Sequence, residues 1–128
     1  MVRERIRALT APVEHGCVFL RAVESKETHD DWDPPSSRVS AGDDSVLFAV
    51  VPSVDGDVEF EIWRGDPDIP FSDVLHEGSI ALAYGVIVLY DPNDDFRIQI
   101  PGLGYGGPLS ILVDDVVFPK KVQISLRF

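Results

Sequence analysis

An antiparallel β-sandwich of about eight strands is the all-β fold that this sequence predicts, as a single domain over residues 1–128. In several segments apolar and polar residues alternate with a period of two, as a half-buried strand requires. Turn-forming residues separate the segments at roughly the eight- to twelve-residue spacing of sandwiches and barrels. No segment repeats apolar residues every three or four positions over a helical length, so no helix is predicted.

Three segments alternate strictly and predict strands with one buried face: residues 57–63, 96–100 and 122–128. In the first, DVEFEIW, the residues expected to face the core are Val58, Phe60 and Ile62. The residues expected on its outer face are Glu59, Glu61 and Trp63. Apolar runs rich in β-branched and aromatic residues predict five further strands, at residues 17–23, 45–51, 79–84, 86–90 and 109–113.

Turn signals predict how these strands connect. Asp55-Gly56 is typical of a two-residue hairpin and would pair the strand before it with residues 57–63. The sequence DPNDD at residues 91–95 would join two further strands in the same way. Residues 24–44 form a long polar loop, and loops of that length in a compact domain are usually functional or disordered.

The charge of the chain is concentrated in one stretch. Residues 24–77 contain fifteen carboxylates against three basic residues, a net charge of −12 in a chain whose total is −11. Such a field repels nucleic acid and membrane surfaces and attracts basic proteins or cations. With one cysteine and no visible secretory signal, a cytoplasmic protein is expected.

No segment carries a catalytic signature. GLGYGG at residues 102–107 has the glycines of a dinucleotide fingerprint, but Pro108 and a predicted strand follow where a helix is needed, so a glycine-rich crossover is the better interpretation. The aspartates of DPNDD suit turn chemistry better than calcium, and the three histidines lack zinc spacing. We therefore expect no enzyme, no cofactor and no metal, although a site assembled from distant residues stays open.

Two tryptophans lie among the carboxylates. Trp32 is in the polar loop, and Trp63 would share a strand face with two glutamates. An exposed aromatic ringed by charge is typical of a binding hot spot, whereas the alternative is that a loop or the core covers each ring. The candidate partner-binding residues are Asp30, Asp31, Trp32, Asp33, Glu59, Glu61, Trp63, Asp66 and Asp68.

The order of these features resembles the competence protein J family, small inhibitors of a competence-associated DNA-entry nuclease. The shared features are an early strand, a polar segment with Trp32, the Asp55-Gly56 turn before DVEFEIW, and FRIQIP followed by a glycine loop and a strand. The resemblance rests on spacing and hydrophobic pattern, so it assigns no functional residue. Small acidic immunity proteins have a similar profile.

The resulting hypothesis is a non-enzymatic acidic inhibitor or immunity partner of a basic protein, such as a nuclease or toxin, whose carboxylates mimic phosphate charge. It would bind neither nucleic acid nor membranes. The alternative is a carbohydrate- or calcium-dependent β-sandwich that uses the tryptophans and the aspartate loops. A cupin-like or lipocalin-like enzyme is disfavoured because metal-binding histidines are missing.

Overall fold

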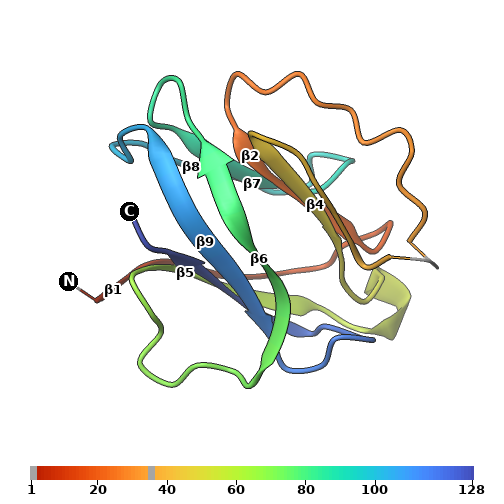
Figure 1. Ribbon diagram of the computed structural model, residues 1–128. Coiled ribbons are helices and arrows are strands. Elements are labelled where there is room, and N and C mark those ends of the chain that lie inside the picture. Colours follow the sequence, from red (N-terminus) through yellow and green to blue (C-terminus); the bar gives the residue numbers. More distant parts are fainter. Residues whose placement is uncertain (1–2, 35–36) are drawn as a thin grey trace.

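A computed structural model, which describes residues 3–34 and 37–128, confirms the all-β sandwich (Figure 1). Two five-stranded sheets form its layers, in the orders β1-β5-β10-β9-β6 (sheet A) and β3-β4-β2-β7-β8 (sheet B). The elements are β1 (Glu4–Ala11), β2 (Cys17–Ala22), β3 (Val39–Ala41), β4 (Ser45–Ala49), η1 (Ser53–Asp55), β5 (Val58–Arg64), β6 (Asp73–Ala81), β7 (Ile87–Tyr90), β8 (Arg97–Ile100), β9 (Gly106–Val113) and β10 (Lys121–Leu126).

Two of these strands lie where none was predicted. β1 and β3 are edge strands of their sheets, and most of their residues are exposed or partly exposed, so their sequences lack a continuous apolar face. β3 falls inside the predicted polar loop at residues 24–44. β6 begins at Asp73 rather than at Ser79, because its first residues are largely exposed on the other edge of sheet A.

The predicted hairpin at Asp55-Gly56 is wrong. β4 belongs to sheet B and β5 to sheet A, so η1 and Gly56, with φ of +126°, carry the chain across the sandwich. A corner between sheets needs the same turn residues as a hairpin, and sequence does not separate them. β5 pairs with β10 in parallel, whereas all other strand pairs among the described residues are antiparallel. The predicted hairpin at residues 91–95 is confirmed between β7 and β8.

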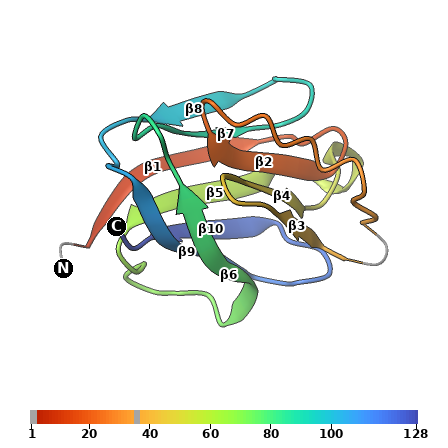
Figure 2. The ribbon, with the colours of Figure 1, turned by 45° about the horizontal axis from the view of Figure 1, so that its top comes forward.

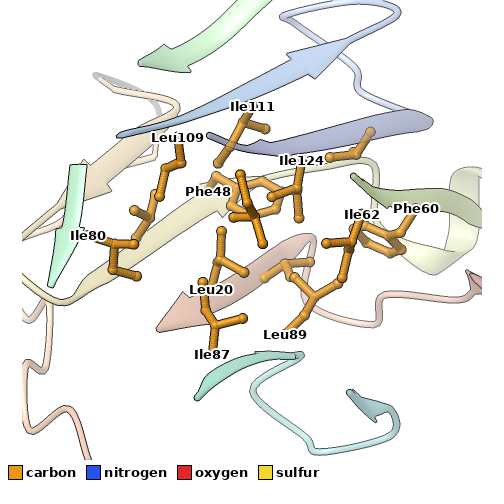
Figure 3. Close-up of a cluster of buried hydrophobic side chains, with 14 of the residues drawn as sticks. Leu20, Phe48, Phe60, Ile62, Ile80, Ile87, Leu89, Leu109, Ile111 and Ile124 are labelled. Atoms are coloured by element: carbon orange, nitrogen blue, oxygen red, sulfur yellow. The ribbon is translucent and has the colours of Figure 1, made fainter. Parts of the chain in front are cut away.

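The core lies between the two sheets (Figure 3). On the side of sheet A, its centre is formed by the residues of β5 that were predicted to face inward: Val58, Phe60 and Ile62 are at most 1% exposed. Leu20 and Phe48 of sheet B meet them from the other layer. On β10, alternate residues are buried as predicted. Gln123 and Ser125, which lie between them and face outward, are also buried, so another segment of the chain packs on the outer face of sheet A.

The helical content of the described residues is limited to the three-residue η1. Among those residues, no helix is long and apolar enough to cross a bilayer.

Candidate partner-binding surfaces

The predicted binding residues fall on two opposite faces of the sandwich. Residues 24–44 are called the acidic loop below. Their described part before β3 lies beside the outer face of sheet B, where His29 meets Ser40 of β3 and Ser45 of β4. They carry Asp30, Asp31, Trp32 and Asp33. The remaining candidates, Glu59, Glu61, Trp63, Asp66 and Asp68, lie on the outer side of sheet A and are called the β5 face. Figures 1 and 2 show the acidic loop and β5 on different sides.

Trp63 is covered rather than exposed. Its register on β5 turns it to the outer side of sheet A, yet only 8% of the residue is accessible. The indole Nε1 donates a hydrogen bond to Glu61 Oε1 at 2.9 Å. Of the two interpretations that the sequence allowed, burial is therefore the one found for this residue, and Trp63 stabilises the fold.

Residues 65–72 cover this part of sheet A, and Gln123 holds them in place. The Gln123 side chain is 4% exposed at the centre of the sheet. Its Oε1 accepts a hydrogen bond from the Phe71 amide at 2.9 Å, and its Nε2 donates to the Ile69 carbonyl at 3.0 Å. A buried amide with its donors and acceptor satisfied fixes this segment, which explains the buried alternate positions of β10.

Basic residues from outside the acidic stretch compensate the carboxylates of the β5 face. The four ion pairs are Glu59–Lys121 at 3.9 Å, Glu61–Arg5 at 4.0 Å, Asp66–Arg127 at 3.1 Å and Asp68–Arg3 at 3.7 Å. Such exposed pairs add little to stability, but they lower the local charge. The sequence alone could not show this, because the pairing arises from strands that are distant in the chain. The β5 face is a mixed-charge surface.

The acidic loop is fixed at its base by the carboxylate of Glu27. This carboxylate accepts hydrogen bonds from the Asp43 amide at 3.0 Å, the Asp44 amide at 3.1 Å and the Ser45 hydroxyl at 2.8 Å. Burial alone would raise the pKa of Glu27, but these hydrogen bonds outweigh it and lower that pKa to about 2. Burial and the neighbouring Glu27 carboxylate raise the pKa of Asp44.

His29 fixes the middle of the loop. Its Nδ1 lies 2.8 Å from the Ser40 hydroxyl, and its Nε2 contacts the Ser45 hydroxyl. Burial and the charge of Arg21 lower the pKa of His29, and we assign the neutral ring with Nε2 as donor, because the Ser45 proton goes to Glu27. Ser45 is fully buried and its proton is already committed, so this serine and histidine form a structural contact rather than a nucleophilic pair.

In the outer part of the acidic loop, Asp30 and Asp31 form no ion pair with a described basic side chain. Asp30, Asp31, Trp32 and Asp33 line an open cavity of about 640 Å³ together with Thr28, His29, Ser37, Val39 and Ser40. Trp32 is half-buried there and donates its Nε1 hydrogen bond to the Ser37 carbonyl at 2.9 Å. The loop's one arginine, Arg38, is directed away to the Val117 carbonyl. The loop therefore places an aromatic ring beside the carboxylates of Asp30 and Asp31.

The rest of the outer face of sheet B carries aromatic rings under arginines, which the sequence interpretation missed. Phe19 stacks on Tyr90 with ring centroids 5.1 Å apart, and the Arg21 guanidinium lies 4.3 Å above the Phe19 ring. Arg97 covers Tyr90 at 5.1 Å. These positive groups border the acidic loop and occupy the rings, so this half of the face differs in charge from the loop.

The catalytic and metal candidates do not converge. Within residues 3–34 and 37–128, no group of three or more His, Cys, Asp and Glu side chains could hold a metal ion. Asp91 serves its turn, where its Oδ1 accepts a hydrogen bond from the Asp95 amide at 2.6 Å. Residues 102–107 lead from β8 into β9 and so cross between the sheets, as the crossover interpretation requires. Cys17 is half-buried. Its burial, and to a smaller extent the negative charge of Asp91, raise the pKa of its thiol.

Two solved structures share this fold along the whole chain. One is ComJ from Bacillus subtilis, described as an inhibitor of the DNA degrading activity of NucA, with a TM-score of 0.74, 9% identity, and coverage of 99% of this chain and 98% of that chain. The other is described as Crocagin biosynthetic gene J, with a TM-score of 0.60, 14% identity and the same coverage of both chains. Neither a protein-family model nor a curated protein sequence matches. The predicted resemblance to competence protein J is confirmed at the level of the fold.

Proposed function

We propose that this chain is a non-enzymatic inhibitor or immunity partner that binds a basic protein, such as a nuclease, through the acidic loop. The observation that carries the proposal is the arrangement of Asp30, Asp31 and Asp33 around the half-buried Trp32, with no lysine or arginine among the described residues that line the cavity. The shared fold with a protein described as a nuclease inhibitor supports it.

The loop would act by occupying a cationic site in place of phosphate. Its seven carboxylates against Lys26 and Arg38 give residues 24–44 a net charge of −5, which speeds encounter with a basic surface. Trp32 supplies apolar contact area at the centre. Because Glu27 and His29 already hold the loop, little ordering entropy is lost on binding. In this proposal the β5 face adds only to the long-range field.

The test compares matched charge reversals on the two faces. A partner is captured from the organism that encodes the chain, purified, and assayed for DNA cleavage and for association rate. Asp30→Lys with Asp31→Lys should slow association on the order of tenfold at low salt and weaken inhibition. Glu59→Lys with Asp68→Lys makes the same change in net charge on the β5 face and should have a much smaller effect.

Three results would contradict the proposal. The captured protein could be acidic, its activity could be unaffected by the chain, or the two double variants could behave alike. Binding that does not weaken with ionic strength would also count against it, and would favour stacking of a sugar on Trp32.

A further inference from the structure

Two loops at one end of the sandwich present exposed tyrosines. Tyr84, between β6 and β7, is 73% exposed, and Tyr105, between β8 and β9, is 89% exposed. The two loops lie side by side because β6 and β9 are paired neighbours, with Ala81 opposite Gly106. Figures 1 and 2 show both loops at the same end, beside the start of the acidic loop. The function proposed above uses neither tyrosine.

The backbone beneath these tyrosines is tightly held. The Leu82 amide donates to the Tyr105 carbonyl at 3.0 Å, and the Leu103 amide donates to the Gly85 carbonyl at 2.9 Å. Leu82 and Leu103 are 2% and 3% exposed and anchor the two loops in the core. Gly85 has a φ of +69° and packs directly on the backbone of the other loop. The loops are therefore fixed, whereas the tyrosine rings are displayed to solvent.

Rigid loops with exposed tyrosines are suited to protein recognition. A tyrosine offers a large amphipathic contact area and has few side-chain torsions to fix, so binding costs little entropy. Neither ring adds buried area to the fold, and two exposed aromatic residues on neighbouring loops form a larger contact patch than a single one. The ends of β6 and β9 thus carry contact groups that the sandwich itself does not need.

Carboxylates adjoin the two loops. Glu24 Oε2 accepts a hydrogen bond from the Ala83 amide at 2.6 Å, and the Asp43 carbonyl accepts one from the Ala81 amide at 3.0 Å. Glu24 Oε1 is buried and has no hydrogen-bond partner among the residues that the structure describes. An open cavity of about 410 Å³ here is lined by Glu24, Lys26, Glu27, Asp43 and Asp44. Four carboxylates against one lysine give this end an unbalanced negative charge.

We propose that Tyr84, Tyr105 and the exposed Asp43 form a docking surface, the tyrosine tip, for an arginine-bearing segment of a protein partner, with Glu24 holding the Tyr84 turn in place. The proposal rests on the proposed function and deepens it by naming the groups on the partner. A guanidinium can stack on a tyrosine ring while its fork donates to a carboxylate, and a lysine ammonium does this less well. The negative charge of the tip opposes docking of a second copy of this chain.

The experiment is an NMR titration of the ¹⁵N-labelled chain with hexa-arginine and with hexa-lysine as a matched probe. Amide shifts should be largest at residues 82–85 and 101–107, and hexa-arginine should bind roughly two- to fivefold more tightly than hexa-lysine. Tyr84→Ser with Tyr105→Ser should abolish this preference. Phe118→Ser, at the other end of the sandwich, removes an aromatic residue that is 60% exposed and should leave the preference intact.

Each alternative outcome is informative. Shifts confined to residues 28–40 would overturn the tyrosine tip and leave the proposed function standing. No shifts with either peptide would count against both. The tyrosine tip would also be contradicted if the tyrosine double variant still bound hexa-arginine more tightly than hexa-lysine. The same holds if sedimentation showed self-association of the native chain that depends on the tyrosines. If the serine variants do not fold, the position of the shifts in the native chain decides.

Discussion

Glu27→Gln tests whether one carboxylate holds the acidic loop in place. The substitution keeps the size of the side chain and one acceptor oxygen but removes the charge that receives the Asp43, Asp44 and Ser45 hydrogen bonds. Hydrogen bonds to a charged group are stronger than neutral ones, so the loss should appear as reduced stability of the whole domain.

The size of the effect follows from the pKa of Glu27. A carboxyl whose pKa falls from 4.5 to about 2 on folding stabilises the native state by at most about 3 kcal/mol. Glu27 is partly exposed, and its removal relieves repulsion with Asp44, so we expect about 1–2 kcal/mol. For a domain of this size that corresponds to a decrease in melting temperature of roughly 4–8 °C.

The difference between the two proteins should depend on pH. Because the folded pKa of Glu27 is depressed, its stabilisation is complete above the unfolded value of 4.5 and is lost as the pH falls towards 2. Asp44 acts in the opposite direction, since its raised pKa makes its carboxylate unfavourable near neutral pH. The two melting curves should therefore differ at pH 6 and converge near pH 2.

Thermal unfolding at several pH values, with ¹³C titration of the Glu27 carboxyl, measures these quantities. Gly42→Ala supplies a second route, because a Cβ there would collide with the Glu27 carboxylate and displace it. In the Glu27→Gln background Gly42→Ala should then add little. Glu4→Gln changes an exposed carboxylate on β1 and is the charge control. A Glu27 pKa near 4.5, or equal effects of Glu27→Gln and Glu4→Gln, would refute the reasoning.

Three further stability predictions can be checked by chemical denaturation. Gln123→Glu removes the side-chain amide that donates to the Ile69 carbonyl and to Glu61 Oε1, so it should lower the free energy of unfolding by about 2 kcal/mol and speed hydrogen exchange in residues 65–72. Gly106→Ala should cost clearly more than Gly104→Ala, which should cost about 1 kcal/mol, because both have positive φ but only the first Cβ would strike backbone. Trp63→Ala should lower the free energy of unfolding by about 3 kcal/mol, whereas loss of an exposed Trp63 would lower it much less.

The sequence predicted the centre of each sheet better than its edges. Strict alternation at β5 identified residues that are buried on one face, because sheet B covers the inner face of this central strand. β1 has a neighbour on one side only and contributes just Ile6, Leu9 and Ala11 to the core or its margin, so its apolar pattern is weak. β3 is three residues long, which is too short for a period-two pattern to be recognised.

The sequence predicted the net charge of residues 24–77, but it did not show which of their carboxylates form ion pairs on the surface. Local sequence places −12 in residues 24–77, but the basic partners of the β5 face are Arg3 and residues of β1, β10 and the C-terminal end. The exposure of Trp63 was open for the same reason, because residues 68–71 lie beside it on the outer side of sheet A, where Gln123, distant in sequence, holds them. Long-range pairing decides both properties, and hydrophobic periodicity carries no information about it.

The two ends of the acidic loop connect its charge to the tyrosine tip. Glu24 begins the loop and holds the Ala83 amide, while Asp43, near the loop's end, holds the Ala81 amide. A partner that draws on the loop carboxylates therefore also meets the turn that carries Tyr84, without any rearrangement of the sandwich. Since the Glu27 hydrogen bonds fix residues 43–45, Glu27→Gln should loosen both surfaces together. Weaker binding of hexa-arginine at residues 82–85 in that variant would show that the loop base positions the tip, whereas unchanged binding there would show that the two surfaces act independently.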